Sequence, residues 1–327
     1  YLGQALAGIE YTKGAILSAS GMGAITPTLL QLCDSGDEII SSRTIYGGTY
    51  AFMKNYLPKF KIKTTFVNTT NTKQIEDAIT ERTKVIYCET MSNPLLEVSD
   101  IESISVLAKK HGIKLVVDNT FTPLVFSPAL LGADIVIHSL TKFINGTSDT
   151  VGGVICSDEE FIESMIDVNS GSSMLLGPVM DSMRAASILK NLRTLHLRMK
   201  KHSENAMYLS NSFQKDGLRV IYPGLETHPQ HELMKKQMNE GFGFGGMLVI
   251  DTKTKEIAND LMEEMQNNNL GYLAVSLGFY KTLFSAPGLS TSSEIPEEER
   301  EEMGLSDGLV RISIGLDNDI ERTHKTM

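Results

Sequence analysis

Short apolar stretches separated by polar segments recur along the first half of the chain, and they predict the strands of an α/β sheet. Residues 114–117 and 134–137 are apolar after a charged first residue, rich in β-branched side chains, and followed directly by polar residues. Such runs are typical of strands that are buried on both faces. We expect further strands of the same sheet at 14–20, 37–41, 64–67 and 84–87.

Apolar residues at helical spacing occur between these strands. Residues 24–33 and 101–111 have this pattern, and Gly112 follows the second as a common helix stop. Residues 1–10 indicate the end of a helix with Leu2, Leu6 and Ile9 on one face. The alternation of strands and helices from about 14 to 154 predicts a doubly wound, mostly parallel sheet.

The second half of the chain has a different pattern. Residues 183–213 are rich in helix formers and predict one long helix that leads into a second domain. Strands are expected at 219–222, 247–251 and 310–314, with a helix at 255–267 between the last two. We therefore expect a large domain at 1–198 and a smaller α+β domain at 199–327. An acidic run at 296–302 indicates a solvated helix start.

Candidate chemistry lies where the two central strands end. Asp118 follows residues 114–117, and Lys142 ends the segment that follows residues 134–137. Ligands of α/β sheets bind at the carboxyl ends of the strands. Taken singly, Asp118 could cap a turn and Lys142 could be an ordinary solvated lysine. Together they suit a pyridine cofactor, because a carboxylate can pair with the ring N–H and an amine can bond to an aldehyde.

The segment around Lys142 adds a candidate phosphate site. Ser139 and Thr141 supply hydroxyl groups, and the small, glycine-rich residues 145–153 allow the backbone to approach a ligand closely. These stretches, VVDNTF, GADIVIHSLTKFINGTSD and VGGV, resemble the cysteine/methionine-metabolism family of pyridoxal 5'-phosphate (PLP) enzymes over nearly the whole chain. The resemblance implies PLP as cofactor and the PLP-dependent transferase fold of type I, like aspartate aminotransferase. It also implies that Lys142 forms the Schiff base, that Asp118 pairs with the pyridine nitrogen, and that Ser139 and Thr141 bind the phosphate.

The same resemblance assigns further residues whose own patterns leave alternatives open. A glycine turn before a helix, an aromatic residue beside two glycines, and an arginine inside a strand each have ordinary structural explanations. By resemblance, the phosphate loop includes Ser20, Gly21 and Met22. Tyr46 is expected to stack on the ring and to exchange a proton with the leaving group, and Asn93 to contact the 3'-oxygen. The resemblance assigns substrate binding to Ser276 and Arg311.

Several segments resemble one branch, the plant-type methionine γ-lyases and close bacterial relatives. They are YGGT, SMLLGPVMDS, VIYPGLETHPQHEL, FGFGGML, YLAVSLG and STSSE. The branch implies α,γ-elimination of methionine to 2-oxobutanoate, ammonia and methanethiol. Three departures leave the preferred thioether open: Gly48 replaces a cysteine, no lysine occurs at 168–170, and Lys281 replaces a glutamate.

Other functions remain to be weighed. Within the family the alternatives are a cystathionine γ-lyase, an O-acetylhomoserine sulfhydrylase or a cystathionine γ-synthase. Outside it they are a nicotinamide oxidoreductase or a non-catalytic relative, although both Lys142 and Asp118 are present. The glycines at 241–246 precede a strand, which argues against a dinucleotide loop. His228 and His231 flank a proline, which favours a surface turn over a metal site.

Charge and composition argue against some classes of binding partner. Its 327 residues carry a formal charge of −10, and no run of Lys and Arg is longer than a pair. This argues against nucleic acid and membrane surfaces, and no stretch of about 18 apolar residues predicts a membrane span. The thiols of Cys33, Cys88 and Cys156 are scattered and odd in number, as in a cytoplasmic protein with reduced cysteines. The chain begins at Tyr1, so a preceding segment, including a targeting signal, could exist. A small amino-acid substrate and a homodimer or homotetramer with shared active sites are expected from the resemblance.

Overall fold

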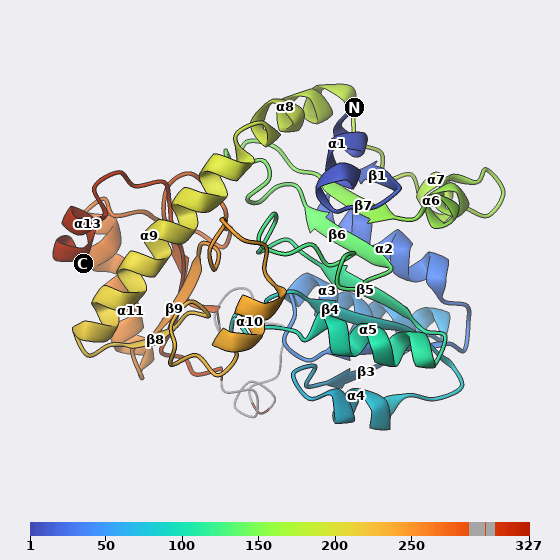
Figure 1. Cartoon of the computed structure of the whole chain (residues 1–327), viewed down its shortest axis with the longest axis horizontal. Coiled ribbons are helices and arrows are strands. Elements are labelled where there is room, and N and C mark those ends of the chain that lie inside the picture. Colours follow the sequence, from blue (N-terminus) through green and yellow to red (C-terminus); the bar gives the residue numbers. More distant parts are fainter. Residues whose placement is uncertain (288–297, 299–304) are drawn as a thin grey trace.

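The computed structural model describes residues 1–287, 298 and 305–327. Figure 1 shows two sheets side by side, with the sheet formed by the earlier part of the chain at the right. The STSSE segment at 290–294, and all of the predicted acidic helix start at 296–302 except Glu298, lie outside the described residues.

The described part of the first sheet has seven strands in the order β1-β7-β6-β5-β4-β2-β3. They are β1 (Gly14–Ser18), β2 (Glu38–Ser42), β3 (Lys63–Val67), β4 (Thr83–Glu89), β5 (Lys114–Asp118), β6 (Ile135–Ser139) and β7 (Gly153–Ser157). The strands from β6 to β3 are parallel, whereas β7 runs antiparallel to both β6 and β1. The predicted mostly parallel, doubly wound sheet is confirmed.

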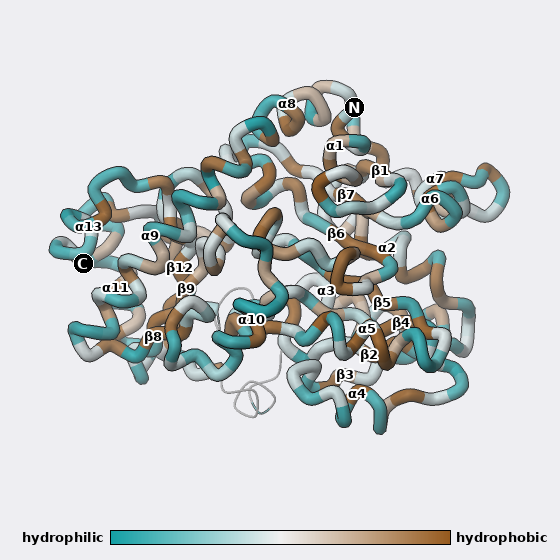
Figure 2. Tube along the Cα trace, in the orientation of Figure 1, coloured by the Kyte–Doolittle hydropathy of each residue, from teal (hydrophilic) through white to brown (hydrophobic). Residues whose placement is uncertain are grey.

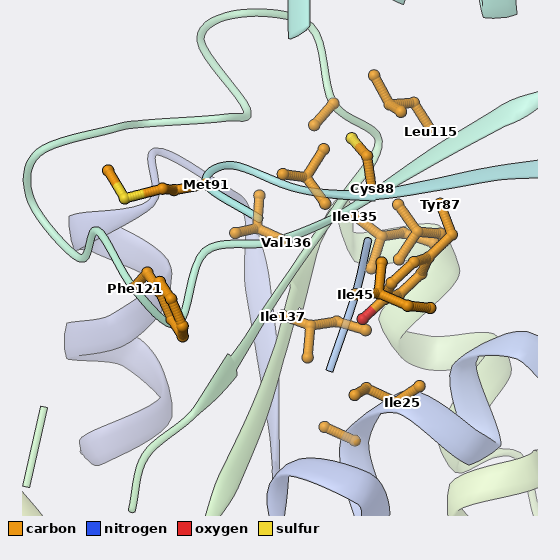
Figure 3. Packing of buried hydrophobic residues seen from close by; sticks show 14 of the residues in the cluster. Ile25, Ile45, Tyr87, Cys88, Met91, Leu115, Phe121, Ile135, Val136 and Ile137 are labelled. Carbon is orange, nitrogen blue, oxygen red and sulfur yellow. The ribbon is translucent and has the colours of Figure 1, made fainter. Parts of the chain in front are cut away.

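Helices pack against this sheet. They are α1 (Leu2–Ile9), α2 (Gly21–Leu32), α3 (Gly47–Ala51), α4 (Thr72–Ala78), α5 (Ile101–Lys110), α6 (Glu159–Ile166) and α7 (Ser172–Leu176). The central strands are apolar on both faces because both faces are covered. In Figure 3, Leu115 of β5 and residues of β6 lie among the buried side chains, with Ile25 of α2 nearby. Burial of this kind contributes about 25 cal/mol per Å² of apolar surface.

The second sheet has five strands in its described part, in the order β10-β11-β12-β9-β8. They are β8 (Arg219–Ile221), β9 (Met247–Asp251), β10 (Tyr272–Leu273), β11 (Leu283–Ser285) and β12 (Leu309–Ser313). Its helices include α10 (His231–Gln237), α11 (Lys255–Asn267) and α13 (Ile320–Thr326). The predicted strands at 219–222, 247–251 and 310–314 and the helix at 255–267 are confirmed, whereas the short strands β10 and β11 were not predicted.

The prediction of one long helix at 183–213 is wrong in one respect. The segment forms α8 (Ser182–Leu192) and α9 (Leu195–Lys215), which meet at Arg193 and Thr194. The Thr194 hydroxyl donates to the carbonyl of Asn191 at 3.1 Å, a local bond that competes with the helical ladder. The expected boundary between residues 198 and 199 lies inside α9, and the division into two domains stays a prediction.

A set of amide side chains joins the two sheets. Figure 1 places α10 next to the helices of the first sheet. The Gln230 side chain accepts from the amide of Val98 at 2.9 Å and donates to its carbonyl at 3.0 Å, as a neighbouring strand would. Gln237 accepts from the amide of Ile101 at 2.9 Å, and Asn239 donates to the carbonyl of Leu124 at 2.8 Å. Side chains of α10 and its flanking residues thus satisfy backbone groups of segments that connect the strands of the first sheet.

His228 and His231 correct a prediction. Both are buried, not exposed on a surface turn, because the ring of His231 stacks on Phe244 and its Nδ1 pairs with the carbonyl of Pro223 at 2.8 Å. Burial lowers the pKa of His228 to about 4. Within the described residues no group of three or more His, Cys, Asp or Glu side chains is placed to hold a metal.

The surface gives two further observations. Figure 2 shows apolar residues concentrated in the strands and polar residues on the outer sides of the helices. None of the helices described is long and apolar enough to cross a membrane. A patch at 166–183 nevertheless exposes large apolar side chains: Ile166, Val168, Met174, Leu175, Leu176, Val179 and Met183. The oligomer and the cytoplasmic location stay predictions.

Candidate active site

A cavity of about 220 Å³ lies at the carboxyl ends of β4, β5 and β6, between the two sheets. Every residue predicted to bind the cofactor lines it: Ser20, Gly21, Met22, Tyr46, Asn93, Asp118, Ser139, Thr141 and Lys142. Arg311 of β12 lines it as well. Ser276 lies between the lining residues Val275 and Leu277. The structure therefore brings together residues that are far apart in the sequence.

The N-terminus of α2 forms one end of the cavity. Ser20 caps the helix by accepting from the amide of Gly23 at 2.9 Å, whereas the preceding amides of Gly21 and Met22 have no carbonyl partner within the helix. A Cβ at Gly21 would lie 2.9 Å from the Cβ of Ser139, and a Cβ at Gly153 would lie 2.2 Å from the carbonyl oxygen of Ser20. These glycines allow the helix end and the strand ends to meet closely. Helix dipole, backbone amides and nearby hydroxyls together suit a phosphate.

Asp118 is the last residue of β5 and is buried. Its Oδ1 accepts from the amide of Thr120 at 2.9 Å, and its Oδ2 accepts from the hydroxyl of Tyr87 at 3.3 Å. Burial raises the pKa of Asp118, while the bonds from Thr120 and the nearby His138 act in the opposite direction. A ring N–H⁺ at this position would stabilise the ionised carboxylate further.

Lys142 is half-buried on the turn that follows β6. Its Nζ donates to the hydroxyl of Ser276 at 3.0 Å. Burial, and secondarily the charge of Arg311, lower the pKa of Lys142 to about 8. An ordinary lysine has a pKa near ~10.4, so a far larger share of this amine is neutral and nucleophilic at neutral pH.

Arg311 is only 2% exposed in the middle of the second sheet. Its guanidinium donates to Asn93 Oδ1 at 2.8 Å and to the carbonyl of Ser276 and the hydroxyl of Ser285, both at 3.4 Å. Burial lowers its pKa to about 10, opposed by the charge of Glu89. It forms no salt bridge with any of the described residues, which supports carboxylate binding over pairing with a buried acid.

The contact with Arg311 also defines what Asn93 can do. Because the amide oxygen of Asn93 accepts from the guanidinium, the amide offers N–H donors to a ligand in the cavity. That chemistry suits the expected contact with an oxygen atom of the cofactor.

Glu89 was not predicted as a site residue, yet it lines the cavity. It is the last residue of β4 and lies in register with Asp118. Its Oε1 accepts from the amide of Tyr46 at 2.8 Å, and burial beside Asp118 raises its pKa well above the ordinary value. Glu89 follows an apolar strand just as Asp118 does, so the rule that selected Asp118 could have found it.

Tyr46 stands at the cavity mouth, 45% exposed, as the N-terminal cap residue of α3. A Cβ at Gly48 would lie 2.6 Å from the Tyr46 ring. Glycine at position 48 therefore leaves space for the ring to lie against the backbone. Tyr46 is held by Glu89 through its backbone amide, which leaves its hydroxyl available to a ligand.

Comparisons with known proteins agree with this geometry. A family model described as Cys/Met metabolism PLP-dependent enzyme matches residues 1–322. The methionine gamma-lyase of Arabidopsis thaliana is 45% identical over 324 residues, which are 98% of this chain and 74% of that protein. The cystathionine gamma-lyase of Dictyostelium discoideum is 38% identical over 318 residues, 96% of this chain and 80% of that protein.

A solved structure gives the same fold. A Campylobacter jejuni protein, provisionally named O-acetylhomoserine (thiol)-lyase, has a TM-score of 0.90 and 30% identity, covering 99% of this chain and 85% of that chain. Its structure contains a pyridoxyl-lysine phosphate. The residues present here fit that group: the α2 N-terminus with Ser139 and Thr141 would hold its phosphate, Asp118 its ring nitrogen, and Lys142 its aldehyde carbon. The chain belongs to the Cys/Met metabolism family of PLP-dependent enzymes, with the type I fold, and it is a PLP-dependent lyase of sulfur amino acids.

Proposed function

We propose that this enzyme catalyses α,γ-elimination of methionine, releasing 2-oxobutanoate, ammonia and methanethiol. The observation that carries the proposal is the shortage of cations in the cavity that would pair with a second substrate carboxylate. Among the described residues that line it, the cations are Lys142 and Arg311, and each has a role in binding or reacting with any amino-acid substrate. The remaining walls are largely apolar: Met22, Ile25, Met91, Phe121, Val151, Val275 and Leu277.

Each polar residue has a position that suits one part of the reaction. When bound, PLP supplies an electron sink for charge that develops at Cα and Cβ. Arg311 binds the substrate carboxylate, and Lys142, with its pKa lowered to about 8, moves protons at Cα and then at Cβ. Asp118 stabilises positive charge on the pyridine nitrogen. Tyr46, at the mouth, protonates the leaving sulfur.

Methionine fits these walls better than cystathionine does. Methionine ends in an apolar methyl thioether, whereas cystathionine carries a second amine and a second carboxylate that need partners. Lys281, which stands where many relatives carry a glutamate, would be the partner for that carboxylate if it faced the cavity, but its side chain is exposed to solvent. Its Nζ donates to the hydroxyl of Tyr272 at 2.9 Å, and it is not among the cavity residues. The similarity to a methionine gamma-lyase supports the same choice.

The test compares kcat/KM for release of 2-oxobutanoate from methionine, homocysteine and cystathionine. We expect methionine or homocysteine to exceed cystathionine by about tenfold, since unpaired polar groups discriminate strongly. The Lys281→Ala variant serves as the control and should keep the wild-type ranking. The proposal is wrong if cystathionine is favoured tenfold and Lys281→Ala removes that preference.

A further inference from the structure

The turn that carries Lys142 is short and needs outside support. Asn145 donates its amide to the carbonyl of Leu140 at 3.0 Å, and Gly146 donates to that of Lys142 at 2.8 Å. The chain then leaves the turn without continuing into a helix. Carbonyls at the end of such a turn have no partner within it and must find donors elsewhere.

Arg198 supplies those donors from the first turn of α9. Its Nη1 donates to the carbonyl of Phe143, and its Nη2 donates to the carbonyl of Ile144 at 2.8 Å. Its Nη2 also donates to the carbonyl of Asn191 at 3.2 Å, at the end of α8. One planar guanidinium thus joins the lysine turn to the junction of α8 and α9, a geometry that a lysine cannot reproduce.

The backbone of the turn is shaped to receive this side chain. Gly146 has a φ of +75°, and a Cβ there would lie 2.3 Å from Nη1 of Arg198. Burial lowers the pKa of Arg198 to about 10, so it remains charged at neutral pH. A charged donor forms stronger bonds to carbonyl oxygens than a neutral one.

The segment between β10 and β11 also contacts the turn. A Cβ at Gly278 would lie 2.3 Å from the amide nitrogen of Phe143, so the two backbones are in close contact. Tyr280 donates its amide to the carbonyl of Gly146 at 3.0 Å. The Lys142 turn is therefore clamped between Arg198 on α9 and the segment 276–280.

We propose that Arg198 is a positioning residue for Lys142: it fixes the turn through the Phe143 and Ile144 carbonyls and so orients the amine in the cavity. The inference rests on the proposed function only in taking Lys142 as the reacting lysine, and it is independent of which thioether is preferred. Misplacement of a reacting group by about 1 Å costs up to ~10²-fold in rate.

The test compares Arg198→Gln and Arg198→Lys with the control Lys200→Gln, an exposed position on the same helix that loses the same charge. The readouts are kcat and KM on whichever substrate the wild type prefers, and amide hydrogen exchange of residues 140–146 in the cofactor-free protein. We expect Arg198→Gln to lower kcat about tenfold with KM within about twofold, and to speed exchange in the turn. Arg198→Lys should recover part of kcat, and Lys200→Gln should match the wild type.

The proposal is overturned if kcat and exchange of Arg198→Gln both stay within about twofold of wild type, or if Lys200→Gln shows equal losses. If Arg198→Gln does not fold, Arg198→Lys decides: unchanged exchange in the turn would contradict the proposal. A failed substrate prediction would leave the exchange result intact, so the two proposals fail separately.

Discussion

The two walls of the cavity hold their cations in different ways. Lys142 sits on a turn beyond the end of β6, is half-buried, and donates to the side chain of Ser276. Arg311 sits in the middle of a strand, is 2% exposed, and donates to Asn93, Ser276 and Ser285. One wall thus presents an amine at the end of a strand, and the other a guanidinium fixed within a sheet.

Burial lowers the pKa of both cations, but it changes the protonation of only one of them near neutral pH. It lowers the pKa of Lys142 to about 8 and that of Arg311 to about 10. The first value lets the lysine gain and lose a proton near neutral pH, whereas the second keeps the arginine charged. The same physical effect therefore produces a proton carrier on one wall and a permanent anchor on the other.

The largest effect on activity is expected from a substitution of Asp118, the carboxylate on the side of the cavity that carries Lys142. We expect Asp118→Asn to bind PLP but to lose ~10²–10³ in kcat, because the amide cannot stabilise positive charge on the ring nitrogen. Asp134→Asn is a matched control at the far end of β6, where Asp134 accepts from the amide of Leu115 at 2.9 Å. Steady-state kinetics and the cofactor absorbance check both variants. Activity of Asp118→Asn within about threefold of wild type would contradict its role.

A smaller effect on activity is expected from a substitution of Arg311, on the other side of the cavity. Arg311→Gln should raise KM ~10–100-fold with a smaller change in kcat, because a charge-assisted bond to the substrate carboxylate is lost. Arg219→Gln is the control: Arg219 pairs with Asp251 on the same sheet but its side chain is 72% exposed. Such surface pairs contribute little, ~0–1 kcal/mol. Equal changes in both variants would mean that Arg311 only supports the sheet.

The smallest effect concerns the electrostatic influence of Arg311 on the pKa of Lys142. Raising the pH deprotonates Lys142, and only the neutral amine attacks the cofactor aldehyde, so PLP uptake by the cofactor-free protein should speed up as pH rises through about 8. In Arg311→Gln the midpoint should move to higher pH, by a modest amount because burial is the larger cause and Arg311 the second. Absorbance-monitored uptake measures it. A rate independent of pH between about 7 and 9 would contradict the assignment.

The sequence predicts the site residues around Lys142 better than it predicts the role of Arg311. The apolar strands are followed within five residues by Asp118, Ser139 and Lys142, so local pattern and resemblance locate them without any knowledge of packing. For Arg311 the pattern alone left two roles open, and only its partners in the fold separate them. The clamp by Arg198 depends on α9 reaching back across more than fifty residues, which no local pattern reveals.

The secondary structure likewise contains elements that the local pattern predicts and features that it does not. The central strands and α11 match their predicted ranges closely, because periodicity and burial agree there. The break between α8 and α9 and the burial of His231 were not predicted. The Thr194 hydroxyl bonds to the backbone at the first of these places, and the Phe244 ring and the Pro223 carbonyl hold His231 at the second. Such side-chain contacts outweigh local propensity.

The chain order of the cavity residues has a consequence for biosynthesis. The phosphate end is built from residues near positions 20 and 140, the lysine turn from residues near 142, and the carboxylate anchor from residue 311. Synthesis proceeds from the N-terminus, so a nascent chain can form the first sheet long before Arg311 leaves the ribosome. The arginine side of the cavity is therefore completed well after the lysine side. A ligand stabilises the state that binds it. A ligand that contacts both Lys142 and Arg311 therefore stabilises the completely folded protein more than its folding intermediates.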